Sequence, residues 1–278
     1  MTTYINAIDP LARVFDGFFV HSRFGGAPTP EGAGTRGGPN AQTPTGVKLR
    51  TDVRVPVMTL ITETDLIGNQ TSGFWTARQP DSPKLRAWEV AGTAHTDNYM
   101  YLIGGIDDGA VPIEKLAALW APNPTLLGRK LTKPMNAAPQ HHYVAMAAMA
   151  HLDTWVRTGK APPRSPRLEI TPPSAPGQTP SLVLDANGNA KGGIRSPWVD
   201  VPTMKLSGLA NAGGAFAGLV GSSEPFDAAK LAALYPGGKA DYMKKVEASL
   251  KRALAGGFIL PADVAEIRAL TAAMFPAR

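Results

Sequence analysis

Two short segments of this sequence place acidic side chains and a histidine directly after apolar runs that have the length of buried strands. Glu63 and Asp65 follow the run Val55–Ile61, and His95 follows the run Leu85–Val90. In an open parallel sheet, side chains just beyond the carboxyl ends of the strands face a binding crevice. We therefore expect one of the two carboxylates to meet His95 at one edge of a sheet, although they lie far apart in the sequence.

An imidazole paired with a carboxylate is the proton-handling part of many hydrolases. The neutral ring takes a proton from a nucleophile, while the carboxylate fixes the tautomer of the ring and stabilises the imidazolium that forms. Glu63 and Asp65 lie on one face of an extended segment, so both are candidates for the acid. Either carboxylate could instead cap the turn that follows it. Asp97 is expected to cap the helix that begins near Thr96 rather than to orient the ring of His95.

The sequence does not present a nucleophile in a recognisable motif. In G-x-S-x-G a sharp strand-to-helix turn exposes the serine hydroxyl, but no serine here has both flanking glycines. Ser22 lies in VHSRFG, Ser72 in QTSGFW, and Ser222 and Ser223 in VGSSEP. The sequence contains 0 cysteines, which excludes a thiolate nucleophile and a disulfide scaffold.

Strands and helices alternate around the candidate pair. Val14–His21, Val55–Ile61 and Leu85–Val90 have the length and composition of buried strands. Gln140–Arg157 carries apolar residues at helical spacing, with proline before it and glycine after it, which predicts an amphipathic helix. The alternation predicts the α/β class with a parallel sheet. The Gly- and Pro-rich segment Ser22–Thr51 predicts a long surface loop.

The composition of the chain changes after residue 160. The stretch APPRSPRLEITPPSAPGQTP predicts an extended connector, and Asn187 followed by Gly188 predicts a hairpin turn. Helices are expected after it at Asp227–Tyr235, Asp241–Ala255 and Pro261–Met274. We divide the chain into a core, residues 1–160, and a connector, hairpin and helical extension packed on the same domain, residues 161–278.

Several classes of ligand are disfavoured by composition and pattern. The net charge of +6 comes from 28 basic and 22 acidic residues, which are scattered, so a nucleic-acid partner is not expected. No apolar run is long enough for a membrane span, and the first residues carry no export signal. His141, His142 and His151 lie on one predicted helix without metal-ligand spacing, so we expect surface or interface residues, no metal and no cofactor. The compartment stays open.

The two strand ends carry a family resemblance. VPVMTLITETD followed by RQPDSPKLRAWEVAGTAH resembles the last two core strands of the α/β-hydrolase fold, and closely resembles a bacterial group described as alpha/beta hydrolase domain-containing proteins. The similarity extends through DANGNAKGGIRSPWVDVP and the helical tail. It implies an incomplete α/β-hydrolase fold, with the last parallel core strands, helices and a C-terminal hairpin and helical extension. It also implies hydrolysis of a small-molecule carboxylic ester, with His95 as the triad histidine and Asp65, or alternatively Glu63, as the acid.

The resemblance also implies which part is missing. In the family a serine elbow leads into a helix and the next strand, and MTTYINAIDPLARVFDGFFVHSR resembles the remainder of that helix and its strand. The serine is therefore expected just before Met1, because of an internal start codon, a shortened gene or a fragment that needs a partner. Loss of the earlier strands would leave a sheet edge uncovered and favour self-association. The competing interpretation is a non-catalytic interaction or remnant protein that uses the hydrolase scaffold.

Overall fold

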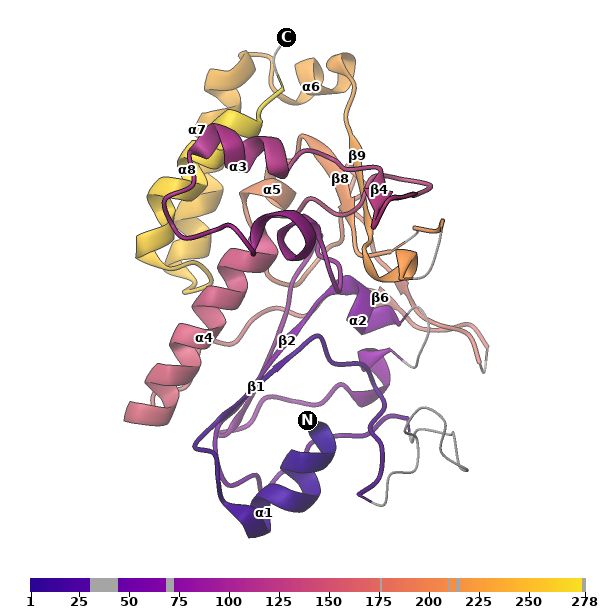
Figure 1. Cartoon of the computed structure of the whole chain (residues 1–278), viewed down its shortest axis with the longest axis vertical. Coiled ribbons are helices and arrows are strands. Elements are labelled where there is room, and N and C mark those ends of the chain that lie inside the picture. The colour runs from indigo at the N-terminus through magenta and orange to yellow at the C-terminus, as the bar shows by residue number, and fades with distance from the viewer. Residues whose placement is uncertain (31–44, 69–72, 176, 210, 214–215, 277–278) are drawn as a thin grey trace.

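A small parallel sheet lies at the centre of the part of the protein that carries the candidate residues. The computed structural model of the chain describes residues 1–30, 45–68, 73–175, 177–209, 211–213 and 216–276. The strands β1 (Phe18–His21), β2 (Val57–Ile61) and β3 (Leu85–Glu89) are hydrogen-bonded in that order, and both pairs are parallel (Figure 1). The α/β class predicted from the alternation of strands and helices is confirmed.

The two inner strands are buried on both faces, as their continuous apolar runs predict. All five residues of β2 and all five of β3 are buried, and Ile61 lies opposite Glu89 in the register. The strand predicted from Val14 begins only at Phe18. Val14 is 65% exposed and therefore lies outside the core, although its side chain has strand propensity.

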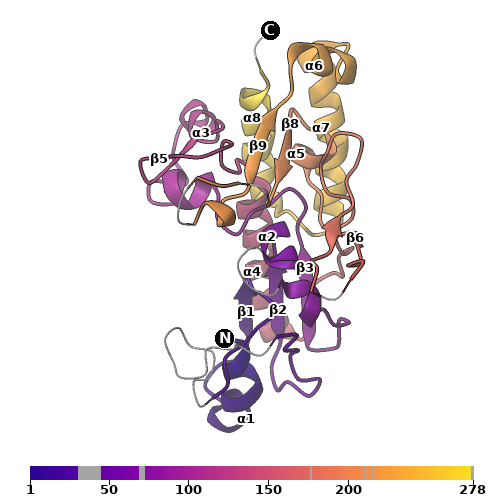
Figure 2. The same cartoon turned by 90° about the vertical axis from the view of Figure 1, so that its right-hand side faces the viewer.

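One long helix covers a face of this sheet. α4 (Gln140–Thr158) agrees with the predicted helix to within one residue and ends at Gly159, whose φ of 76° is the left-handed conformation that glycine adopts without strain. Val144 and Ala148 of this helix pack in one apolar cluster with Met58 and Trp88 of the strands. Figure 2 shows α4 running beside β1 and β2. The helix is thereby fixed relative to the strand ends.

The C-terminal half is joined to the sheet by its connector and its hairpin. Arg86 and Trp88 of β3 donate side-chain hydrogen bonds to the carbonyls of Pro162 and Pro163. The predicted hairpin is present, because Leu184 and Ala190 pair across the turn. Just after it, a parallel bridge between Val90 and Ile194 extends the sheet. The second half of the chain therefore packs directly against β3.

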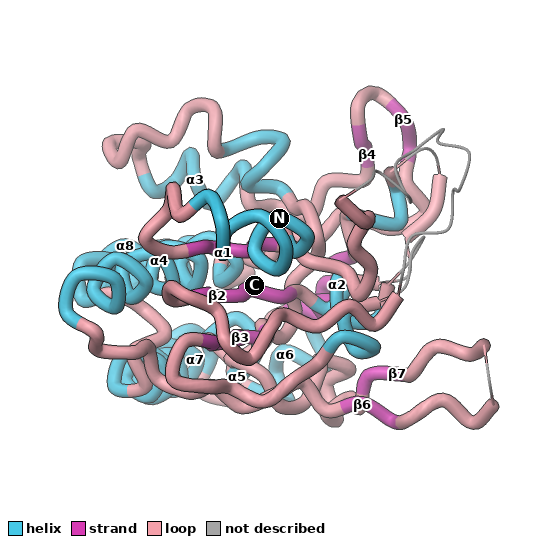
Figure 3. Tube along the Cα trace, turned by 90° about the horizontal axis from the view of Figure 1, so that it is seen from below, coloured by secondary structure: helices cyan, strands magenta, loops and turns pink. Residues whose placement is uncertain are grey.

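The remaining elements surround this centre. The proline-rich connector is not wholly extended, since β6 (Ile170–Thr171) and β7 (Ser181–Leu182) pair into a hairpin that projects from the body (Figure 3). The three predicted C-terminal helices are found as α6 (Ala228–Leu234), α7 (Gly238–Ala255) and, after the turn η5 (Pro261–Asp263), α8 (Val264–Met274). The other elements are η1 (Tyr4–Ile8), α1 (Asp9–Ala12), α2 (Glu63–Ile67), η2 (Phe74–Ala77), η3 (Tyr99–Ile103), α3 (Ile113–Leu119), β4 (Thr125–Leu126), β5 (Arg129–Lys130), α5 (Pro197–Asp200), β8 (Met204–Ser207), η4 (Ala217–Leu219) and β9 (Ser222–Pro225).

Two expectations concern segments with little regular structure. The predicted loop Ser22–Thr51 includes residues 31–44, which lie outside the described residues, and its described parts contain neither helix nor strand. None of the helices in the described ranges has the length and apolar character needed to cross a bilayer.

Candidate active site

His95 and Asp65 meet at the carboxyl ends of β3 and β2. Nδ1 of His95 lies 2.6 Å from Oδ1 of Asp65, a distance typical of a charge-assisted hydrogen bond. The Asp65 side chain is fully buried, whereas the side chain of His95 is 24% exposed to solvent. The predicted meeting of an acid with His95 is therefore present in the structure. The catalytic role of either residue stays a prediction.

Local hydrogen bonds hold the carboxylate of Asp65 in place. Thr62 is the N-cap of α2, and its backbone N–H and hydroxyl both donate to Oδ2 of Asp65, at 3.1 and 2.7 Å. The backbone N–H of Asp65 in turn donates to the Thr62 hydroxyl, which completes a capping box. Oδ1 of Asp65 is left to accept from His95. One carboxylate thus starts the helix with one oxygen and orients the ring with the other.

Residues other than Asp65 also fix the position of His95. The ring of Phe24 stacks on it at a centroid distance of 5.3 Å. The backbone N–H of His95 donates to the hydroxyl of Thr64, 3.1 Å away, and that hydroxyl donates to the carbonyl of Gly208. The loop after β3 is therefore attached to the first turn of α2, which favours a single orientation of the ring.

Glu63, the alternative candidate for the acid that contacts His95, binds backbone N–H groups instead. Its two carboxylate oxygens accept the backbone N–H groups of Gly92, at 2.5 Å, and Gly208, at 2.8 Å. Burial raises the pKa of Glu63 to about 7, although these two hydrogen bonds act in the opposite direction. Glu63 therefore ties the end of β2 to the segments after β3 and β8, and Asp65 is the carboxylate that contacts His95.

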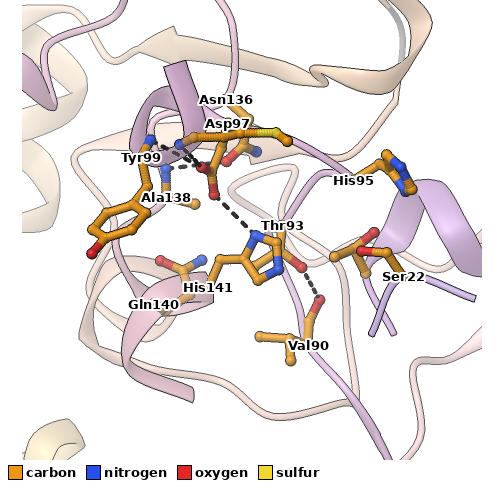
Figure 4. Close-up of polar contacts among 12 residues, drawn as sticks. Ser22, Val90, Thr93, His95, Asp97, Tyr99, Asn136, Ala138, Gln140 and His141 are labelled. Carbon is orange, nitrogen blue, oxygen red and sulfur yellow. Dashed lines mark hydrogen bonds and ion pairs between the residues drawn. The ribbon is translucent and has the colours of Figure 1, made fainter. Parts of the chain in front are cut away.

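A second imidazole–carboxylate pair lies beside the first. Nδ1 of His141, in the first turn of α4, is 3.0 Å from Oδ2 of Asp97, and Nε2 of His141 is 2.8 Å from Nε2 of His21. Figure 4 shows the His141 ring directed toward Asp97, with His95 and Ser22 at the other side of the view. Oδ1 of Asp97 accepts the backbone N–H groups of Tyr99 and Met100. Asp97 thus accepts backbone N–H groups at the start of η3, as expected of a cap, although Asn98 is the N-cap residue, and it also orients His141.

The expectation that His141, His142 and His151 are surface or interface residues is wrong for His141, which is 7% exposed. Its pairing with Asp97 and His21 makes the burial of its ring favourable. His142 is partly buried and stacks on Tyr99 at 4.2 Å, and Nε2 of His151 contacts the carbonyl of Gly257. Among the described residues, no three His, Asp or Glu side chains converge as metal ligands would.

Ser22 directly follows β1 at the same sheet edge. Its φ of 56° is left-handed, which is uncommon for a residue other than glycine. Its hydroxyl lies 3.0 Å from Nδ1 and 3.4 Å from Nε2 of His21. The shorter contact pairs the hydroxyl with the neighbouring ring of His21. No helix begins directly after Ser22, unlike in a nucleophile elbow.

His95 and the pair formed by His141 and Asp97 line one cavity of about 520 Å³, and its walls also include Ser22 and three methionines. Sequence reasoning missed the contribution of His21 and His141, because their elements come together only in the folded chain.

The comparison with protein families agrees with this arrangement. Residues 1–269 match the sequence profile of a family described as alpha/beta hydrolase domain. The chain belongs to this alpha/beta hydrolase domain family. No curated protein and no solved structure matches the chain. The parallel pairing of β1, β2 and β3 is consistent with membership of this family.

Proposed function

We propose that this alpha/beta hydrolase domain takes part in the hydrolysis of carboxylic esters. His95 is the general base and then the general acid, and Asp65 orients it. The observation that carries the proposal is the 2.6 Å contact between these two side chains, which come from the ends of neighbouring parallel strands. That arrangement supplies the proton-transfer part of an acyl-transfer site.

The geometry defines the role of each atom of the pair. When Nδ1–H of His95 donates a hydrogen bond to Asp65, Nε2 carries the free lone pair and can accept a proton from a hydroxyl nucleophile. The ring then becomes an imidazolium, which the buried negative charge of Asp65 stabilises. The same Nε2–H protonates the alkoxide as it leaves. Asp65 takes no proton from the ring in this cycle and remains the acceptor of its hydrogen bond, while Thr62 donates to the other carboxylate oxygen.

The nucleophile is a separate part of the proposal. Because no serine of this sequence lies in G-x-S-x-G, we propose that the reactive serine belongs to a segment outside this sequence. Ser22 is placed at the correct edge of the sheet, but its hydroxyl faces His21. The polypeptide as given is therefore expected not to turn over p-nitrophenyl butyrate.

The test begins with the coding frame upstream of Met1. An in-frame G-x-S-x-G supports the proposal, and the extended chain should then hydrolyse p-nitrophenyl butyrate. His95→Ala should lower kcat by about 10⁴-fold or more. His151→Ala is the matched control, because His151 lies on α4 and contacts Gly257 instead of the candidate acid; its kcat should be unchanged.

Two outcomes would contradict the proposal. Full activity of the extended chain after His95→Ala would remove His95 from the chemistry. Turnover by the present polypeptide that disappears with His95→Ala would show that the chain contains its own nucleophile. Stop codons upstream would instead favour a non-catalytic interaction protein that retains the hydrolase scaffold.

A further inference from the structure

The cavity beside His95 has one polar end and one apolar flank. Its polar end includes His95, His141 and Asp97. Its apolar flank includes Met100 of η3, and Met146 and Met149 on α4. A volume of about 520 Å³ is within the range found for small-molecule sites. The cavity therefore has room for more than the reacting atoms of an ester.

The methionines of the flank are exposed to this space rather than packed in the core. Met100 is 65% exposed, Met146 40% and Met149 42%. On α4 the wall follows His142, Ala145, Met146 and Met149, and this spacing of three and four residues places them on one face of the helix. Flexible thioether side chains adapt to apolar ligands of different shapes.

The polar groups at the inner end are already paired with one another. Both oxygens of Asp97 accept hydrogen bonds, and both ring nitrogens of His141 have partners. The cavity wall, taken over the described residues, contains neither Lys nor Arg. A phosphate or carboxylate would find no permanent cation there, whereas an aliphatic chain would find an apolar surface.

We propose that this cavity binds the aliphatic acyl chain of the ester, with the carbonyl at His95 and the chain along Met146 and Met149. The inference rests on the proposed function, because the hydrolysed bond defines which end of the ligand lies at His95. It adds the substrate class, namely esters of aliphatic acids, and it assigns the selection of chain length to α4 and Met100.

The test uses ligands that need no nucleophile. 2-Hexanone, 2-octanone and 2-decanone carry a carbonyl group and an alkyl chain but no ester bond, so their binding is measured on the protein as it exists. The affinity should rise by up to about fourfold for each added CH₂ until the chain outgrows the cavity. Equal affinities for 2-hexanone and 2-octanone would overturn the proposal.

The histidines provide an internal control for the position of the ligand. The sequence contains 5 histidines, and four of them line the cavity while His151 does not. In nuclear magnetic resonance spectra, 2-octanone should shift the ring signals of His95 and His141 and leave His151 unchanged. Equal shifts for His151 and His95 would show binding elsewhere and overturn the proposal.

A charge on the apolar flank should prevent binding. Met149→Glu is expected to weaken the binding of 2-octanone by about tenfold or more, because the ligand would have to displace water from a carboxylate. Thr154→Glu adds the same charge at an exposed position of α4 outside the cavity wall and should leave the affinity unchanged. Equal weakening by both variants would contradict the assignment. Ketone binding without ester hydrolysis by the extended chain would leave the cavity assignment intact and refute the proposed function alone.

Discussion

Nε2 of His21 lies 2.8 Å from Nε2 of His141, so one of these nitrogens must donate the proton that the other accepts. The opposite ring nitrogen of His141 faces Asp97. This contact gives the two histidines different affinities for a proton. Burial lowers the pKa of His141, but its hydrogen bond to Asp97 and the charge of that carboxylate outweigh the burial and raise it.

The first prediction concerns the titration of these two rings. Burial of the ring, and to a smaller extent the nearby His141, lowers the pKa of His21 from 6.5 to about 4. We expect His141 to stay protonated to a higher pH than a free histidine, and His21 to be neutral at neutral pH. Ring signals followed by nuclear magnetic resonance against pH will measure both values. Asp97→Asn should lower the pKa of His141, and titration of both rings together near 6.5 would contradict the pairing.

A second prediction concerns the capping box. Thr62→Ala removes a side-chain donor to Asp65 and the acceptor for its backbone N–H, so urea unfolding should show a loss of about 1 kcal/mol. The ring signals of His95 should also shift, because its acceptor is no longer held. Asp227→Ala removes the N-cap of α6, which accepts from Lys230, and should cost a similar amount. If Asp227→Ala shifts the signals of His95 equally, the effect is not local to the capping box.

A third prediction follows from the raised pKa of Glu63. Its folded-state value of about 7 lies above the ordinary 4.5, so the folded protein holds this proton more tightly than the unfolded chain does. The resulting contribution to stability is fully present below about pH 4.5 and is lost as the pH rises through about 7. Glu63→Gln removes this pH dependence and places an amide N–H₂ against a glycine N–H, which costs about 1–3 kcal/mol.

Urea unfolding at about pH 5 and at about pH 8 tests this linkage. Wild type should exceed Glu63→Gln in stability by more at the lower pH than at the higher one. An equal difference at both values would show that Glu63 titrates as it does in an unfolded chain.

A fourth prediction concerns the free side of β1. In the described chain β1 is an edge strand, paired only with β2. Phe18 and Ser22 donate their N–H groups to β2 and the segment before it, so the N–H of Phe19 points away from the sheet. We propose that this edge allows two copies to associate. Sedimentation should show concentration-dependent association that Phe19→Pro abolishes, because proline has no N–H to donate.

Phe15→Ala separates edge pairing from simple hydrophobic contact. Phe15 is 48% exposed and precedes β1, so its removal reduces the apolar surface but keeps the backbone of the edge. Association should persist in this variant. A protein that is monomeric at every concentration would contradict the prediction.

The elements near the site were predictable where apolar runs were continuous or helix ends carried clear signals. β2 and β3 follow from runs in which every residue is buried, and α4 from helical spacing that ends at Gly159. The short helix α3 and the pair β8–β9 were not predicted, because their stability depends on packing against distant segments rather than on a local pattern.

Some features of the candidate site could likewise be predicted from the sequence, and others could not. The meeting of an acid with His95 followed from the rule that parallel strands end at one edge. The sequence could not show which of Glu63 and Asp65 contacts His95. That outcome depends on a hydrogen bond to Glu63 from the backbone N–H of Gly208, which lies much later in the chain. The contact between His21 and His141 was missed because 120 residues separate them, and neither segment alone indicates the other.

The divided use of Asp65 has a further consequence. One carboxylate oxygen of Asp65 caps the start of α2 and the other orients the ring of His95. A substitution at Asp65 therefore changes the helix cap and the orientation of the ring together. A substitution that stabilises this turn would change the orientation of the His95 ring, and one that changes the orientation of the ring would destabilise the turn. A variant that changes this turn without disturbing His95 is therefore expected to need coordinated substitutions at Thr62 and Asp65.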